Sequence, residues 1–181
     1  MAVYSTQRFL SLVLLTALVP GGIVYSAWAS TAHYYPFCDN ITSGGLLVPT
    51  SVENLTRASS TIVMGEIVSV GPSWQASSGE VFTHITVNVS EYLKNNQSST
   101  SLRFEVSGGS IGCYSVRAED EPGFSVHERV LIFLLFDQAG RLRVTGGTQG
   151  KYVISDGTAY WGDPSNSVSL ENLIATIKQY V

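Results

Sequence analysis

The feature that most limits how this chain can fold is a run of seven consecutive apolar residues from Val130 to Phe136. A helix needs about 20 apolar residues to cross a membrane, so this run is too short to do so. A short and wholly apolar segment is typical of a β-strand that is buried on both of its faces. The sequence therefore predicts one fully buried strand, against which other elements pack.

Shorter β-patterns stand on both sides of this run. The segment 81–89 has the clearest alternation, with Ile85, Val87 and Val89 on one face and His84 and Thr86 on the wetter one. Segment 110–123 is rich in turn-forming residues, and Gly71-Pro72 closes the first strand pattern. The predicted strands are 61–70, 81–89, 102–106, 130–136, 142–144, 151–155 and 158–161. So many short strands indicate a mainly β protein, either a closed or nearly closed β-barrel or, as the alternative, a β-sandwich.

Two short helices are expected to flank the strands. Thr50 and Glu53 form a capping-box pattern, which predicts a helix that ends at Ser59 or Ser60. Near the C-terminus, apolar residues recur at helical spacing after a candidate cap at Ser169. They are Leu170, Leu173, Ile174 and Ile177. This pattern predicts an amphipathic C-terminal helix.

The first 29 residues have the order of parts that a secretory signal peptide requires. Arg8 is the only charged residue before Asp39, an apolar run occupies 9–19, and Ala27-Trp28-Ala29 supplies an A-x-A cleavage site. Cleavage there predicts a signal peptide at 1–29, an irregular N-terminal segment at 30–49 and a single domain at 50–181. The alternative is an uncleaved membrane anchor, because residues 9–29 carry no charge. Pro20 argues against that helix.

Export would place the chain in an oxidising compartment, outside the cytoplasm. The only two cysteines, Cys38 and Cys113, are then expected to form a disulfide bond. Neither has a second cysteine or a histidine at metal-ligand spacing, so no metal site is expected. Four N-x-S/T sequons fit the same compartment and are candidate glycosylation sites. They begin at Asn40, Asn54, Asn88 and Asn96.

Charge and motifs limit the function further. Without the leader and its Arg8, nine basic residues face 14 acidic ones, a net charge of −5 that gives no reason to expect nucleic acid or an anionic membrane as partner. The acidic run at 119–121 is read as a solvated loop, and the glycine-rich segments 107–110 and 146–150 as turns. Lys151, Tyr152, Tyr160 and Trp161 form an aromatic group that can either bind a sugar or protein or pack in the core.

Three segments carry a resemblance to a known family. Segments 55–70, 85–94 and 124–134 are similar to the core pattern of tissue-inhibitor-of-metalloproteinase-like and netrin-like modules, which also recurs in secreted microbial proteins. That pattern consists of "A-D-x-V-V-x-G-x-V", "V-x-V-x-x-x-L-K-G" and "F-x-x-G-E-x-V-L-x-F-L". From the first of these segments to the last, the match spans roughly half of the chain after the leader. The resemblance implies an OB-like, five-stranded and partly open β-barrel.

The departures from this pattern concern function. Ser60, Asn95 and His127 stand where the pattern has an acidic residue, a glycine and a glycine. The inhibitors of this family hold the target's metal with a cysteine at the mature N-terminus in a C-x-C motif. Cys38 would be the ninth residue after the predicted cut and lacks that partner, so no inhibitory residue is carried over.

No catalytic motif or cofactor-binding motif occurs in the sequence. His33, His84 and His127 are isolated from one another, and His84 is expected to be a solvated strand residue. We therefore expect a secreted or surface-associated binding protein that acts on another extracellular protein, without enzymatic activity or cofactor. The alternative is a structural component of a cell envelope or extracellular assembly, retained by an uncleaved N-terminal helix.

Overall fold

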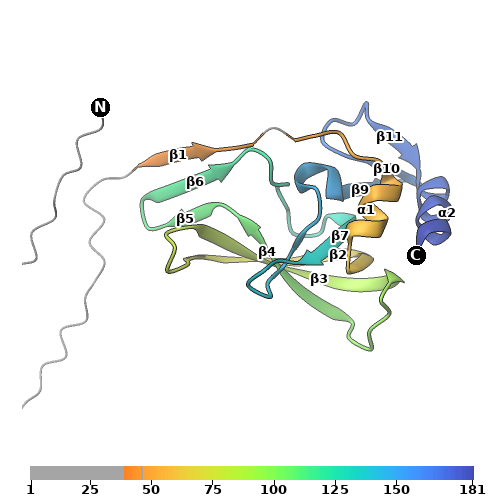
Figure 1. Ribbon diagram of the computed structural model, residues 1–181, viewed down its shortest axis with the longest axis horizontal. Coiled ribbons are helices and arrows are strands. Elements are labelled where there is room, and N and C mark those ends of the chain that lie inside the picture. The colour runs from red at the N-terminus through yellow and green to blue at the C-terminus, as the bar shows by residue number, and fades with distance from the viewer. Residues whose placement is uncertain (1–38, 46) are drawn as a thin grey trace, which may run out of the picture. The chain divides into compact units, whose positions relative to one another are not determined.

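The computed structural model describes residues 39–45 and 47–181 and is mainly β, as predicted (Figure 1). The predicted signal peptide, His33 and Cys38 lie outside the described residues. The strands are β1 (Asn40–Ser43), β2 (Thr61–Gln75), β3 (Val81–Lys94), β4 (Ser101–Ser107), β5 (Gly109–Ile111), β6 (Tyr114–Ala118), β7 (Arg129–Phe136), β8 (Leu142–Val144), β9 (Lys151–Ser155), β10 (Thr158–Tyr160) and β11 (Ser167–Ser169). The helices are α1 (Val52–Ala58), α2 (Leu170–Tyr180) and a 3-10 turn, η1 (Gly147–Gly150).

Eight strands form one sheet in the order β11-β10-β9-β7-β2-β3-β4-β8. β8 also pairs with β7, so the five strands β7, β2, β3, β4 and β8 have a partly ring-like arrangement. We call these five the ring strands. β8 pairs antiparallel with β7 and parallel with β4, where Glu105 lies opposite Arg143. β7 and β8 form the predicted hairpin.

The predicted buried strand, β7, lies between two apolar clusters. Val130, Ile132 and Leu134 point into the space that the ring strands enclose and pack there with residues such as Ile85 and Phe104. The alternate residues, Leu131 and Phe133, pack outside the ring against β9, β10 and the two helices. The side chains from Val130 to Leu134 are fully buried, which confirms the prediction for this part of the run, but Phe136 at its end is 56% exposed.

The two helices contact each other and close the outer cluster. The prediction that Thr50 caps α1 is wrong. The N-cap is Ser51, whose hydroxyl accepts a hydrogen bond from the N–H of Asn54. The N–H of Thr50, which Glu53 would bind in the predicted capping box, donates to the distant Gln149 side chain. The amphipathic C-terminal helix is confirmed as α2, where Leu173 and Ile177 are buried. Ser169 precedes α2 but makes no capping hydrogen bond with its side chain.

The prediction that Gly71-Pro72 ends the first strand is also wrong, because β2 continues to Gln75. Proline has no N–H for a strand ladder, and it is tolerated in a strand at a bulge. The β2–β3 register shifts between Val70 and Ser73, so Pro72 falls within such an irregularity. β3 likewise extends beyond its predicted end, to Lys94.

The segment predicted as turns at 110–123 contains a hairpin instead. β5 and β6 pair antiparallel, and β1, in the segment predicted to be irregular, pairs parallel with β6 (Figure 1). Gly109 allows β5 to lie against β2 and β3, since a Cβ at this residue would lie 2.0 Å from the Ser73 hydroxyl. This close approach depends on residues far away in the sequence, which is why local patterns do not indicate it.

Candidate binding face on strands β3 and β4

The candidate site lies on the outer side of β3 and β4. Ile85 and Phe104 point into the ring, and side chains alternate along a strand, so their neighbours His84, Arg103 and Glu105 point outward. The β3–β4 register sets His84 directly opposite Glu105. The alternation in 81–89 and 102–106 already separates these inner and outer residues.

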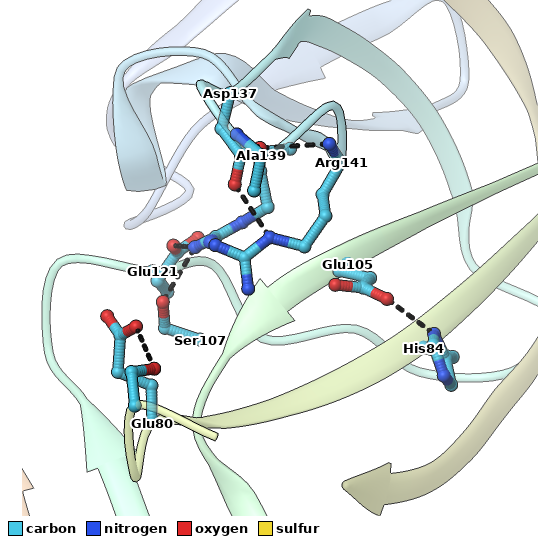
Figure 2. Close-up of polar contacts among 10 residues, drawn as sticks. Glu80, His84, Glu105, Ser107, Glu121, Asp137, Ala139 and Arg141 are labelled. Carbon is cyan, nitrogen blue, oxygen red and sulfur yellow. Dashed lines mark hydrogen bonds and ion pairs between the residues drawn. The ribbon is translucent and has the colours of Figure 1, made fainter. Parts of the chain in front are cut away.

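The side chains of His84 and Glu105 lie against each other and are partly buried by the surrounding residues (Figure 2). His84 Nδ1 lies 3.1 Å from Glu105 Oε1, and the two side chains are 22% and 13% exposed. The indole of Trp74 on β2 stacks on the His84 ring, with 6.0 Å between the centroids and 17° between the planes. The expectation that His84 is a solvated strand residue is therefore wrong. The side chain of Trp74, from the extension of β2, covers it.

Two arginines close one end of this face. Arg143 on β8 donates hydrogen bonds to Glu121 and Ser107, and Arg141 in the β7–β8 turn donates to Asp137 (Figure 2). Both guanidinium groups also lie over the ring of the fully buried Phe82, 4.2 Å from its centroid for Arg141 and 4.9 Å for Arg143. These contacts hold the β7–β8 turn against β3.

Asp137 organises the turn that carries Arg141. Its carboxylate accepts hydrogen bonds from the backbone N–H groups of Ala139 and Arg141 and from the Arg141 side chain (Figure 2). Burial by itself would raise the pKa of Asp137. The hydrogen bonds from Arg141 and Ala139 and the charge of Arg141 outweigh burial and lower this pKa below its ordinary value. The turn is thus tied to an ionised carboxylate.

A cavity of about 540 Å³ opens between this turn and the outer side of β3 and β4. Its lining includes His84, Arg103, Glu105 and Arg141. Arg103 is exposed, and within residues 39–45 and 47–181 it makes no ion pair or side-chain hydrogen bond. Glu105 Oε2 is a buried oxygen without a hydrogen-bond partner in the same part of the chain. The cavity therefore offers guanidinium donors beside a free carboxylate acceptor.

Within the described part of the chain, other buried polar atoms in and beside this cluster also lack a hydrogen-bond partner. Trp74 Nε1 is buried and has no hydrogen-bond partner among the described residues. Within residues 39–45 and 47–181, His84 Nδ1 also lacks a hydrogen-bond partner, although it lies 3.1 Å from Glu105 Oε1. Buried polar atoms are nearly always hydrogen-bonded in folded proteins, so this group of atoms on one face is unusual. An indole N–H can only donate and a carboxylate oxygen can only accept. A ligand that both donates and accepts hydrogen bonds would satisfy this pair.

The other residues that the sequence singled out lie elsewhere. His127 pairs with Glu66 at 3.0 Å on the surface, and the described residues contain no group of three His, Cys, Asp or Glu placed to hold a metal ion. In the acidic run, Glu121 is not a solvated loop residue, because it binds Arg143. Neither His127 nor the acidic run contributes a ligand-binding group to the cavity.

Of the aromatic group near the C-terminus, Tyr152 belongs to the core, whereas Tyr160 and Trp161 are half-buried. Tyr152 is 4% exposed and packs between Phe133 and Trp161, at 6.0 and 5.4 Å between ring centroids. Of the two readings left open by the sequence, core packing is therefore confirmed for Tyr152. Burial also raises the pKa of its hydroxyl. Lys151 is buried as well and pairs with Glu128 at 2.7 Å.

The four sequon asparagines are all exposed. Asn40 lies in β1, Asn54 in α1, Asn88 in β3, and Asn96 in the turn that follows β3. None of them lines the cavity beside Arg103. Carbohydrate at these asparagines would therefore leave the lining of that cavity unmodified.

Sequence reasoning alone did not identify most of this face. Arg103 and Glu105 could have been placed there by the alternation in 102–106, since both occupy the face opposite Leu102 and Phe104. No local signal brings Trp74, Arg141 and Arg143 to the same place, because they come from β2, the β7–β8 turn and β8.

No family model, curated protein or solved structure matches this chain. Within the described residues, no helix is long and apolar enough to cross a membrane.

Proposed function

We propose that this chain is an exported binding protein whose β3–β4 face docks a segment of another extracellular protein. The observation that carries the proposal is the pair of buried and unpartnered polar atoms, Trp74 Nε1 and Glu105 Oε2, on a face that also has a cavity. A polypeptide supplies both a carbonyl for the indole and an N–H for the carboxylate. The proposed role is binding rather than catalysis.

The charges on the face support an acidic docking segment. Arg103 has no acidic partner in the described part of the chain, and a guanidinium binds a carboxylate with two parallel hydrogen bonds. Arg141 donates to Asp137 through Nε, which leaves its terminal nitrogens for a ligand. A polyanion such as nucleic acid fits less well, because the chain carries more acidic than basic residues.

The strand order supports the finer description of the fold as an OB-like barrel. An OB-fold is a five-stranded, partly open barrel that binds ligands on strands two and three and on the loops next to them. Counted along the ring strands, β3 and β4 are the second and third, and the turn with Arg141 is the loop between the fourth and fifth. The proposed binding face would then occupy the surface that OB-folds commonly use.

Two backbone conformations support the resemblance to the inhibitor-like and netrin-like modules. Asn95 and His127 stand where that family's pattern has glycine, and they adopt φ values of 58° and 69°. Glycine reaches this left-handed region without strain, and asparagine and histidine are among the residues that tolerate it best. The substitutions thus keep the backbone shape that a glycine pattern implies.

A photo-cross-linking experiment tests the binding proposal. Benzoylphenylalanine is placed at Gln138, an exposed residue of the turn beside the cavity, or at the exposed control position Ala175 on α2. Each full-length protein is irradiated in the extracellular medium of the cells that make it, and adducts are resolved by mass. We expect one protein adduct from Gln138 and none from Ala175.

A charge reversal makes this experiment specific to the face. Adding Arg103→Glu to the protein that carries benzoylphenylalanine in place of Gln138 should abolish the adduct, because the substitution places a carboxylate against the acidic segment. The proposal is overturned by the absence of any adduct, by equal adducts at the two positions, or by an adduct that survives Arg103→Glu. Circular dichroism of each variant verifies that it is folded.

The proposal of export includes the disulfide bond between Cys38 and Cys113. β1 and β6 run parallel, and their register pairs Asn40 with Ser115. Cys38 precedes Asn40 by two residues, and Cys113 precedes Ser115 by two residues. Equal spacing from a parallel pair supports these two cysteines as partners. Closing so long a loop would restrict the unfolded chain by about 4 kcal/mol in the entropic description.

The mass of the exported protein tests these proposals together. After enzymatic removal of any N-glycans, we expect an N-terminus at Ser30 and no cysteine that reacts with an alkylating reagent before reduction. An intact Met1 would instead favour the anchored structural component. Alkylation of Cys113 without prior reduction would refute the disulfide bond. It would not affect the binding proposal, which the cross-linking experiment tests.

A further inference from the structure

We propose a second site, separate from the β3–β4 face, that binds a small amphipathic molecule through its apolar part. It is a cavity of about 470 Å³ on the inner side of the same two strands, between the end of the ring and strand β6. Ile85 and Val106 form its floor, and Val116, Pro122 and Phe124 form one wall. The volume lies within the range of about 300–1,000 Å³ that small-molecule sites occupy.

The floor of this cavity is apolar and well supported. Ile85 and Val106 belong to the cluster inside the ring and are 1% and 7% exposed. Phe124 packs edge-on against the buried Phe104, with 5.3 Å between ring centroids. At the mouth, Val70 remains 42% exposed although it lines the cavity. An apolar group that enters would cover Val70 and remove this surface from water.

The polar side chains of the wall are mostly occupied by one another. The Thr83 hydroxyl donates to the carbonyl of Gly108 and bonds to Ser73, and the Ser115 hydroxyl accepts a bond from Ser110. Glu121 is held by Arg143. The other carboxylate oxygen of Glu121, Oε2, is buried and has no hydrogen-bond partner among the described residues. A ligand can therefore donate one hydrogen bond to Glu121 while its apolar part packs against Ile85, Val106 and Phe124.

The charged residues at the rim limit which head group the ligand can carry. Arg117 and Glu119 are exposed, line the cavity and stand two residues apart on β6 and just after it, so opposite charges lie side by side at the mouth. A head group that is uncharged or carries both charges suits this rim better than a single ion does. The ligand class is thus a short alkyl chain or a compact aromatic group that carries such a head.

Tryptophan substitution at two exposed valines of β2 provides a matched pair of variants. Val70 lines the cavity, whereas Val68 is 45% exposed and does not line it. The probe is N-phenyl-1-naphthylamine, an apolar dye whose emission rises when it leaves water. We expect saturable binding by the full-length protein and by Val68→Trp, and at least about a tenfold weaker Kd for Val70→Trp because its indole fills the mouth.

A second blocking variant and a competitor complete the test. Val116→Trp narrows the cavity from the β6 side and should also raise the Kd for the dye by about tenfold or more. Octanol should displace the dye from the unmodified protein. Absence of saturable binding by a folded protein, or equal affinity of the Val68 and Val70 variants, would overturn the proposal. Cross-linking at Gln138 probes the other side of the sheet, so each site can fail independently of the other.

Discussion

Gly65→Ala is expected to destabilise the protein by about 3 kcal/mol. Gly65 lies in β2, and a Cβ there would meet the backbone oxygen of Asn88 in β3 at 2.2 Å and the side chain of Val87 at 2.9 Å. The clash involves backbone rather than a flexible side chain, so the two strands must separate. β2 and β3 are neighbours within the ring, and their separation would open the core. Urea denaturation followed by tryptophan fluorescence measures the loss.

A second glycine provides the control for this substitution. No atom lies within 4 Å of a Cβ built at Gly123, and this residue does not adopt a positive φ. Gly123→Ala should therefore change the free energy of unfolding by less than about 0.5 kcal/mol. Equal denaturation midpoints for the two variants would contradict the close approach of β2 and β3 at Gly65.

Glu128→Ala is expected to lower the free energy of unfolding by about 3 kcal/mol at neutral pH. Its carboxylate lies 2.7 Å from the ammonium of Lys151, and the two side chains are 19% and 10% exposed. Lys151 also donates to the carbonyl of Gly123 and lies over the Phe124 ring, at 4.6 Å from the centroid. Removing Glu128 leaves a buried ammonium without a counter-charge, and burying an unpaired charge strongly destabilises the folded state.

The pH dependence of Glu128→Ala identifies the cause. Burial already lowers the pKa of Lys151 from 10.5, although the hydrogen bond and charge of Glu128 oppose this shift. Without Glu128 the pKa of Lys151 in the folded state falls further, so the unfolded chain binds more protons than the folded one between the folded-state pKa and the unfolded-state pKa. The variant should then regain stability, relative to the unmodified protein, as pH rises toward that value.

Two further variants separate this effect from a general loss of side-chain contacts. Glu53→Ala removes the exposed pair with Arg57, whose side chains are 42% and 62% exposed, and should cost less than about 1 kcal/mol. Glu128→Leu combined with Lys151→Met replaces both charges with apolar groups and should recover most of the stability that Glu128→Ala loses. A double variant as unstable as Glu128→Ala would indicate that packing, rather than charge, explains the loss.

The sequence predicted part of the candidate binding face. Alternation in 81–89 correctly put His84 on the side opposite Ile85, but the prediction that water surrounds it was wrong. Trp74 covers His84 only because β2 continues past Gly71-Pro72. The arrangement of Trp74, Glu105 and Arg141 depends on pairing between segments distant in the sequence. No short window of residues carries that information.

The sequence by itself determined those elements whose apolar residues form a regular local pattern. A short apolar run predicts a strand covered on both faces, which holds for β7 from Val130 to Leu134 but not for Phe136. A 3.6-residue apolar period predicts a helix with one buried side, and α2 has that form. Only the tertiary structure decided where strands pair across irregularities: the bulge at Pro72, the hairpin of β5 and β6, and the parallel partner β1. These depend on hydrogen bonds and close contacts between distant segments, which set the energy of each local conformation but leave no period in the sequence.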